Sequence, residues 1–240
     1  MKDWRKYWSN YRLITINTDE DLLFQTGWTV ARKSISKEIF DKEVIRIKSQ
    51  LKLEETDLLL DLCCGNGVLT YELSKYVKKI IGVDFSKPFF ENAVKYKCSE
   101  NIEYYLFDIK EIDKLLKQLM IRPTKVLMYG ALAYLKPKDA QNILDKLFSF
   151  SNGNMLLFIG SVLDREKKWK FFNTYSRKLD YIVKQGLLRR NVGLGRWWYK
   201  KDFDKLCAQI NLKTEFIVQD ESLFTSHYRF DVIISNDNKQ

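Results

Sequence analysis

The stretch LLLDLCCGNGVLT, residues 58–70, places an acid, two cysteines and two glycines within one short segment. Its continuous apolar start predicts a buried strand, and the residues after Gly67 predict a helix. Gly65 and Gly67 allow a sharp turn and a close approach of the backbone to a ligand, which a Cβ would obstruct. Three alternatives arise for this loop: a phosphate cradle, a metal or redox site, or a cradle for another ligand.

The cysteines do not indicate a metal site. Cys63, Cys64, Cys98 and Cys207 form no Cys-x-x-Cys pair, and His227 is the sole histidine. A zinc site needs three or four such ligands at suitable spacing. We therefore expect no metal and interpret the cysteines as small apolar residues of a reducing compartment.

The loop also departs from phosphate-binding patterns. A dinucleotide fingerprint would carry a third glycine where this chain has Thr70, and a P-loop would end in Gly-Lys-Ser/Thr. Asp61, on the predicted strand, would repel a pyrophosphate but attract an ammonium or a sulfonium group. Asp84 lies 17 residues after Gly67, at the end of the next predicted strand, where a carboxylate can accept both hydroxyls of a ribose. These features predict a site for a cationic adenosine ligand.

The elements that position these residues alternate along the chain. Short apolar runs predict strands at 58–64, 79–84, 102–108, 125–130 and 154–160. Amphipathic segments predict helices at 68–77, 86–98, 112–119 and 137–150. The alternation predicts an α/β fold, a doubly wound and mostly parallel sheet. Two final strands, at 212–220 and 228–235, are joined too closely for a helical crossover, so we expect an antiparallel C-terminal hairpin that completes seven strands.

Ligands of such open sheets bind outside the carboxyl ends of the strands. The candidate cofactor residues therefore follow the predicted strands: Asp61, Cys63, Gly65, Gly67, Asp84, Phe85, Ser86, Asp108, Ile109, Tyr129 and Gly130. Two of them have a structural alternative. Phe85 either covers the ligand or belongs to the core, and Asp108 either contacts the ligand or caps a helix.

The motifs DLCCGNG, GVDFS and FDI, in this order and spacing, resemble the successive motifs of class I S-adenosylmethionine-dependent methyltransferases. The resemblance covers roughly residues 56–160 and 202–235. It implies S-adenosylmethionine as the cofactor, with the glycine loop beside its methionine part. It further implies that Asp84 holds the ribose and that Asp108 meets the adenine amino group. A Rossmann-like methyltransferase fold with an inverted last strand is implied as well.

Residues 1–55 are expected to form an N-terminal helical cap over the cofactor site, followed by the methyltransferase domain at 56–240. The cap includes a predicted helix that Ser34 or Ser36 begins. Its apolar residues recur at helical spacing: Ile35, Ile39, Val44, Ile47 and Leu51. Before it, the irregular stretch 24–33 offers Trp28, which we expect either to close the cofactor site or to pack against helices.

The formal net charge of +10 is concentrated in one segment. Residues 165–205 hold 13 Lys and Arg against 4 Asp and Glu, and they largely overlap an expected substrate-side insertion at about 161–201. This excess indicates a surface that faces an anion, or else a solvated helix face. Arg189, Arg190 and Arg196 are the candidates to bind an anionic acceptor. The insertion begins with one predicted helix whose apolar face carries Trp169, Phe172, Ser176, Leu179 and Val183.

The segment after the fourth strand, MYGALAYL, lacks the Asn/Asp-Pro-Pro-Tyr motif of the family members that methylate amino groups of nucleic-acid bases. The resemblance is therefore to the small-molecule branch. We expect a small anionic acceptor, such as an acidic or phosphorylated sugar or metabolite, with O-methylation favoured over N-methylation. Tyr134, Tyr228 and Arg229 are the further candidates to bind it. His227 is either a general base or a structural residue.

Two other functions stay open. An RNA methyltransferase would use the basic segment, where Trp197, Trp198 and Tyr199 either stack on bases or pack against the next helix. The same segment suits an anionic membrane surface. The third hypothesis is a non-catalytic protein that binds an adenosine ligand. With 45% hydrophobic residues, no apolar run of about 18 residues and no signal-peptide pattern, we expect a globular cytoplasmic protein without a membrane span.

Overall fold

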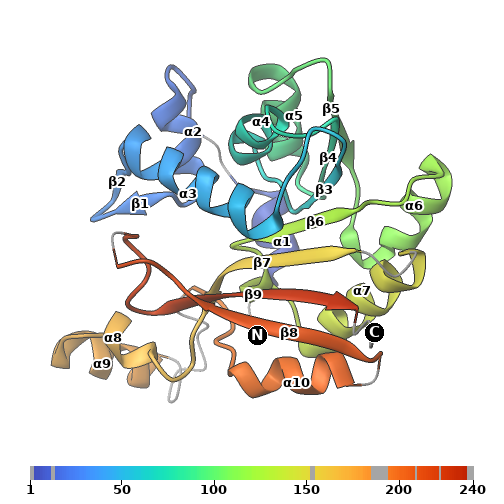
Figure 1. Cartoon of the computed structure of the whole chain (residues 1–240). Helices are drawn as coiled ribbons and strands as arrows, with labels where there is room; N and C mark the ends of the chain where they lie inside the picture. Colours follow the sequence, from blue (N-terminus) through green and yellow to red (C-terminus); the bar gives the residue numbers. More distant parts are fainter. Residues whose placement is uncertain are drawn as a thin grey trace.

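The computed structural model describes residues 3–11, 14–151, 155–184, 194–208, 210–221 and 223–236. Its centre is a seven-stranded sheet in the order β5-β4-β3-β6-β7-β9-β8 (Figure 1). The strands are β3 (Leu58–Leu62), β4 (Lys79–Asp84), β5 (Ile102–Leu106), β6 (Lys125–Tyr129), β7 (Leu156–Leu163), β8 (Leu212–Val218) and β9 (Arg229–Asn236). Neighbours from β5 to β7 are parallel, whereas β9 is antiparallel to β7 and β8. The predicted α/β sheet with its inverted last strand is confirmed.

Helices cover both faces of the sheet. One face carries α6 (Ile112–Leu119), α7 (Pro137–Phe150) and α10 (Lys200–Ala208). The other face carries α2 (Asp19–Gln25), α3 (Lys37–Leu51) and α4 (Val68–Ser74). The helix α5 (Lys87–Tyr96) packs beside β4 and β5. In the described part of the chain, no helix combines the length and the apolar character that a bilayer span requires.

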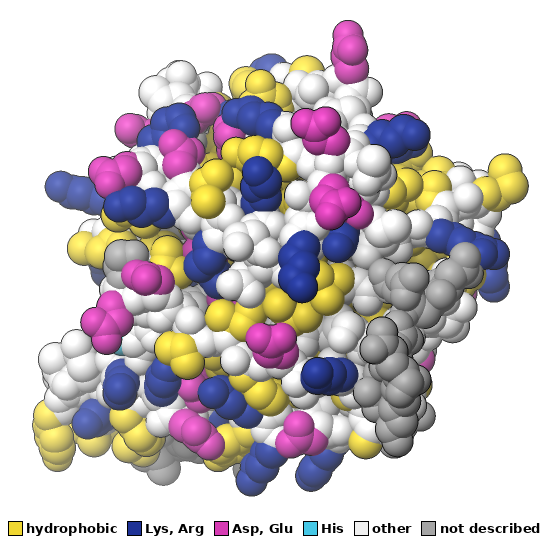
Figure 2. Space-filling model, in the orientation of Figure 1, with side chains coloured by type: hydrophobic (Ala, Val, Ile, Leu, Met, Phe, Trp, Pro, Cys, Tyr) yellow, Lys and Arg dark blue, Asp and Glu magenta, His cyan; other side chains and the backbone are white. Residues whose placement is uncertain are grey.

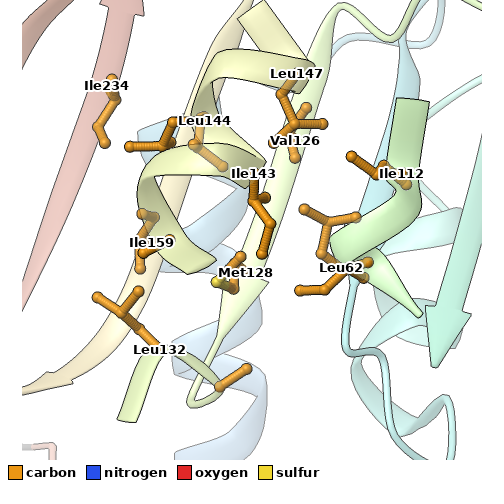
Figure 3. Close-up of a cluster of buried hydrophobic side chains, with 14 of the residues drawn as sticks. Leu62, Ile112, Val126, Met128, Leu132, Ile143, Leu144, Leu147, Ile159 and Ile234 are labelled. Carbon is orange, nitrogen blue, oxygen red and sulfur yellow. The ribbon is translucent and has the colours of Figure 1, made fainter. Parts of the chain in front are cut away.

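The alternation of side chains along each strand separates two apolar layers. Leu60 and Leu62 of β3 pack with α6 and α7, whereas Leu59 packs with α3 and α4. Figure 3 shows strand and helix residues of the first layer meeting: Leu62, Val126, Met128 and Ile159 with Ile112, Ile143, Leu144 and Leu147. Asp61 lies between Leu60 and Leu62, so its side chain points to the opposite face, toward α4.

The first 55 residues divide into parts with different positions. The helix α1 (Trp4–Ser9) and α2 come first, followed by a two-stranded ribbon of β1 (Thr29–Val30) and β2 (Lys33–Ser34). Of the two predicted caps, Ser36 begins α3, because its Oγ accepts the Ile39 N–H at 3.4 Å. The helix α3 belongs to the apolar layer that packs on the sheet, so it is not separate from the rest of the fold. The cap predicted over residues 1–55 stays a prediction.

The single helix predicted at the start of the insertion is wrong. The chain forms α8 (Lys168–Phe171) and α9 (Tyr175–Ile182), together at one end of the molecule (Figure 1, lower left). Thr174 starts the second helix, because its Oγ1 accepts the Arg177 N–H at 3.3 Å. The break changes the helical phase, so Phe172 and Tyr181 are buried while Leu179 is exposed.

Candidate functional site

The loop after β3 has an unusual backbone. Cys63 has a left-handed conformation with φ 60°, so β3 ends at Leu62 rather than at Cys64. Gly65 and Gly67 are also left-handed, with φ 59° and 75°, and Gly67 leads directly into α4. The Cys64 N–H donates to the Val83 carbonyl at 3.1 Å, which ties the loop to β4. The glycines are thus required by the turn itself.

Asp84, at the end of β4, holds the glycine loop in place. Its Oδ2 accepts the Gly65 N–H at 2.9 Å, and its Oδ1 accepts the Ser86 N–H at 2.8 Å. Burial raises the pKa of Asp84 to about 6, although these hydrogen bonds lower it. The acid that the motifs assign to the ribose therefore lies beside the loop and orders it.

Asp61 lies below the same loop. Its Oδ2 accepts the hydroxyl of Thr70 at 2.6 Å, and its side chain is buried. Burial raises the pKa of Asp61 to about 7; the Thr70 hydrogen bond opposes this rise and the charge of Asp84 adds to it. Thr70 stands where a dinucleotide fingerprint has a glycine, and its role in positioning Asp61 was not predicted. Two buried acids close together favour a cationic ligand.

The affinity for S-adenosylmethionine is expected to rise with pH through the titration of Asp61. A cationic ligand favours the carboxylate form, and with a pKa of about 7 most of Asp61 is protonated at pH 6. Binding at pH 6 must therefore displace a proton, whereas binding at pH 7.5 mostly does not. We expect a dissociation constant roughly five- to tenfold larger at pH 6. Calorimetry at the two pH values measures it, and a dependence that persists in Asp61→Asn would contradict the assignment.

Gly67 also makes room for the aromatic ring of Tyr104. A Cβ at Gly67 would lie 2.4 Å from the Tyr104 hydroxyl oxygen and 2.9 Å from its Cζ. That hydroxyl donates to the Lys97 carbonyl at 2.8 Å, so the ring cannot move without breaking this bond. Close packing at the start of α4 is therefore a second reason for glycine, and only the folded chain reveals it.

Gly67→Ala is expected to lower the free energy of unfolding by about 2 kcal/mol, because it adds overpacking to a left-handed backbone position. Chemical denaturation measures the loss. Tyr104→Phe removes the atom nearest to the new methyl group, so the double variant should lose less than the sum of the two single variants. Strictly additive losses would show that the contact with Tyr104 is not the cause.

The loop is further attached to α2. Asn66 is buried, and its amide donates to the Leu22 carbonyl at 2.8 Å and to the Gln25 Oε1 at 3.2 Å. A Cβ at Gly65 would lie 3.1 Å from the Cγ2 of Thr26, just after the same helix. The N-terminal part thus contacts the glycine loop directly, through residues that the sequence pattern did not single out.

The helix α1 lies against the residues that follow β4, β5 and β6. The Ser86 hydroxyl donates to the Trp8 carbonyl at 2.8 Å, and Arg5 pairs with Asp108 at 2.9 Å. The rings of Trp4 and Trp8 lie 4.8 and 5.2 Å from the ring of Tyr134. The aromatic and basic residues of MKDWRKYWSNYR were the available signal for these contacts.

The acid assigned to adenine has two partners in this structure. Besides pairing with Arg5, Asp108 caps the short helix η1 (Ile109–Glu111) by accepting the Lys110 N–H at 3.0 Å. Both expected roles are therefore compatible with its position. The next residue, Ile109, is buried in the core, whereas Phe85 is half-buried and belongs to none of the apolar clusters of the described residues.

The structure places Trp28 and Tyr129 against each other. Their rings stack at 4.9 Å with an interplanar angle of 9°, and Phe40 packs edge-on against Trp28 at 5.0 Å. The hydroxyl of Tyr129 hydrogen-bonds to Glu43 of α3, and burial raises the pKa of Tyr129. Gly130 is a better candidate than Trp28 or Tyr129 to contact the cofactor, because it has φ 67° and open space where a Cβ would lie.

Arg229 lies at the carboxyl edge of the sheet, where its charge acts on Tyr134. Arg229 begins β9 opposite Leu163, the last residue of β7. Its Nη1 donates to the Ser161 carbonyl at 3.0 Å and to the Ser161 hydroxyl at 2.7 Å. Burial raises the pKa of Tyr134, and the charge of Arg229 partly opposes this rise. The Nε of Arg229 is buried without a hydrogen-bond partner, so this guanidinium retains an unused donor.

The neighbours of Arg229 in the sequence have different surroundings. Tyr228 is buried, with Phe171 at 4.8 Å and Trp197 at 6.2 Å between ring centroids. His227 is exposed, its ring is 4.7 Å from that of Tyr228, and partial burial and Lys170 lower its pKa. The described contacts bring neither residue to Tyr134, so their predicted roles in binding and catalysis stay predictions.

Of the three arginines predicted to bind an anionic acceptor, the structure describes one. Arg196 is exposed and its guanidinium lies 4.7 Å from the ring of Trp198, while its N–H donates to the Ala133 carbonyl at 2.7 Å. The backbone of Arg196 therefore lies beside Ala133, the residue that precedes Tyr134. Arg189 and Arg190 fall outside the described residues. The tryptophans at 197 and 198 are both buried, as the packing alternative predicted.

The cysteines of the loop have no ligand partners. Burial raises the pKa of both Cys63 and Cys64, so the thiols stay protonated at neutral pH. Over the ranges that the structure describes, no group of three His, Cys, Asp or Glu side chains could hold a metal ion.

The strand order and the loop define the class I methyltransferase fold, and comparisons with known proteins agree. Residues 59–152 match the family model described as a methyltransferase domain. The crystal structure of magnesium protoporphyrin IX methyltransferase from Synechocystis, with bound SAH, is 14% identical, covers 98% of both chains and has a TM-score of 0.62. Residues 59–152 therefore match a methyltransferase domain, and the chain has the fold of S-adenosylmethionine-dependent class I methyltransferases, as its motifs predicted.

The two sequence relatives described next match about a third of the chain. An RNA methyltransferase from Nostoc is 34% identical over 34% of this chain and 18% of its own length. The ribosomal RNA small subunit methyltransferase A from Caldanaerobacter subterraneus is 37% identical over 32% of this chain and 30% of its own length. The chain thus spans less than a third of the length of these curated relatives.

Proposed function

We propose that this protein transfers a methyl group from S-adenosylmethionine to an oxygen atom of a small anionic acceptor. One observation carries the acceptor class: Arg229, at the carboxyl edge, is held by Ser161 through neutral groups and keeps a buried Nε without a partner. A half-buried cationic group without a carboxylate partner is costly unless an anion joins it. A carboxylate or phosphate of the acceptor would satisfy this requirement.

The residues around the glycine loop fit the cofactor. Asp84 and Asp61 supply negative charge, Gly130 leaves open space, and Trp8 has a buried Nε1 without a hydrogen-bond partner beside Ser86. The cofactor supplies an electrophilic methyl group on a sulfonium. The chain itself orients the ribose through Asp84, balances the positive charge through Asp61 and excludes water with α1.

A general base is unnecessary when the oxygen that accepts the methyl group belongs to the carboxylate or phosphate itself. Carboxylates and phosphates are deprotonated at neutral pH, so the protein needs only to align the acceptor oxygen with the methyl group. We therefore expect His227→Ala to retain turnover within about twofold, since His227 is exposed. A steady-state assay at several pH values checks this, and a loss of turnover above tenfold would restore the histidine to the role of base.

A small acceptor is supported over RNA by two observations. The tryptophans that could stack on bases are buried, and the relatives named as RNA methyltransferases match only 34% and 32% of this chain. The structure that this chain matches over its full length acts on magnesium protoporphyrin IX. RNA methylation is the second candidate, because the exposed Arg196 and its neighbours retain a basic surface.

The proposal is tested in two stages. Calorimetry with S-adenosylmethionine and S-adenosylhomocysteine examines the cofactor, and absence of binding to both would refute the proposal. A methyl-transfer assay with labelled cofactor then compares pools of carboxylate, phosphate and neutral metabolites with total RNA. Label in the anionic pools supports the proposed acceptor class, whereas salt-sensitive label in RNA favours the second candidate. Binding without transfer to any pool would favour a non-catalytic adenosine-ligand protein.

A further inference from the structure

The helices α8 and α9 expose apolar side chains on one side. Tyr175, Leu179 and Ile182 follow one another at helical spacing on α9 and are 82%, 49% and 53% exposed. Trp169 of α8 is 45% exposed. We call these four residues the outer face of α8–α9. Elsewhere on the described surface, large apolar side chains such as Met120 and Val218 are exposed on separate elements.

The outer face is surrounded by positive charge. Residues 165–184 contain 7 Lys and Arg against 2 Asp and Glu. One of the two acids, Asp180, already pairs with Lys184 at 2.6 Å. Figure 2 shows hydrophobic and basic side chains side by side at the lower left, over α8 and α9. The remaining cations around the face are Arg165, Lys167, Lys170, Arg177 and Lys178.

The inner side of the two helices is firmly packed. Phe172 and Tyr181 are buried with their ring centroids 4.4 Å apart, in a cluster that also contains Ala133 and Tyr228. The side chain of Lys168 is buried over the ring of Tyr181, at 3.7 Å. The outer face is therefore exposed on helices fixed to the domain. It needs a partner that accepts apolar groups and carries negative charge.

We propose that the outer face of α8–α9 binds the surface of an anionic lipid bilayer. Amphipathic helices bind such surfaces by inserting apolar side chains below the headgroups while Lys and Arg contact the phosphates. RNA has the same charge and offers bases on which Trp169 and Tyr175 could stack, but the aliphatic side chains of Leu179 and Ile182 cannot stack and would stay exposed. The apolar groups of this face therefore favour lipid over RNA.

This binding would place the acceptor side of the domain at the lipid surface. Tyr228 and Ala133 pack against α8–α9 on one side and directly precede Arg229 and Tyr134 in the chain. An anionic acceptor dissolved in, or attached to, the membrane would then reach Arg229 from the headgroup layer. The lipid interaction goes beyond the proposed methyl transfer and can be measured without it.

Vesicle sedimentation with the full chain tests the lipid proposal. The probes are vesicles of phosphatidylcholine alone and of phosphatidylcholine with about 30% phosphatidylglycerol. We expect binding only to the anionic vesicles. Replacing Leu179 and Ile182 by serine should weaken it at least tenfold, because two half-exposed aliphatic side chains no longer insert. Lys167→Gln with Lys170→Gln should weaken it by about fivefold for each charge removed.

The matched control replaces Met120 and Val218 by serine, two exposed apolar residues outside the outer face. This variant should bind vesicles as the unchanged protein does. Equal loss in the control, or equal binding to neutral vesicles, would overturn the proposal. So would salt-sensitive binding to single-stranded RNA with no binding to vesicles. Calorimetry with S-adenosylmethionine on the same variants tests the proposed function separately, since none of these residues lies at the cofactor site.

Discussion

Asp84→Ala is expected to weaken S-adenosylmethionine binding by at least a hundredfold. The carboxylate accepts the Gly65 and Ser86 N–H groups at 2.9 and 2.8 Å, and we expect it to accept the two ribose hydroxyls as well. Hydrogen bonds to a charged group contribute about 1.5–3 kcal/mol each, so loss of the two ribose bonds alone corresponds to a hundredfold or more. Calorimetry with the purified variant measures the change.

Two further variants separate ligand binding from loop structure. Asp84→Asn keeps one oxygen as an acceptor, and we expect its affinity to lie between that of Asp84→Ala and the unchanged protein. Asp41→Ala removes an exposed acid of α3 that pairs with Lys37, and it should leave the affinity unchanged. If Asp84→Ala bound the cofactor within threefold of the unchanged protein, the assignment of the ribose acid would be wrong.

Arg229→Ala is expected to reduce kcat/KM for the acceptor by at least a hundredfold while leaving cofactor affinity nearly unchanged. A charge-assisted, partly buried ion pair with the acceptor is lost, and such pairs cost about 2–5 kcal/mol when one partner is removed. The measurement is methyl transfer to the anionic metabolites that label in the pooled assay, with calorimetry of the cofactor alongside. Arg229→Lys should recover part of the loss, since it restores the charge without the planar fork.

The control for Arg229 is Arg196→Ala. Arg196 is exposed and lies over the ring of Trp198, so its removal should change kcat/KM by no more than a few fold. Equal losses in both variants would indicate a general electrostatic effect rather than a specific acceptor contact. An Arg229→Ala variant that lost cofactor affinity to the same extent would show that the arginine acts through the fold, by way of its bonds to Ser161.

The position of α1 affects the expected results for both Asp84→Ala and Arg229→Ala. Its residues contact Ser86, Asp108 and Tyr134, which follow three different strands. A cofactor below these contacts would be covered from solvent, and exclusion of water favours transfer to the intended acceptor. The pair between Arg5 and Asp108 joins α1 to the acid assigned to adenine. Cofactor binding and the position of α1 are therefore expected to be coupled.

Much of the fold was predictable because its signals are local. Buried parallel strands read as apolar runs, and the short connection before Arg229 excludes a helical crossover, so the inverted last strand followed from the sequence. The glycine loop and Asp84 were predictable for a similar reason. A backbone turn after a strand and an acid at the end of the next strand meet at one edge in any sheet of this type.

The contacts that complete the site were not predictable, because they join residues far apart in the chain. Arg5 meets Asp108, Asn66 meets Gln25, and the position of Thr70 below the loop depends on the packing of α4. The helical periodicity around residue 175 predicted one helix. A break of a few residues divides it into two, and this changed which side chains are buried.

The sequence by itself determined the class of fold, the glycine loop that we assign to the cofactor and the acid beside it, since these depend on local patterns that neighbouring strands bring to one edge. Only the tertiary structure decided that Arg229 is bound by Ser161 and keeps an unused donor. It also decided that Trp28 stacks on Tyr129 in the interior. The physical reason is that burial and long-range contact arise from packing, which no single segment of the chain specifies.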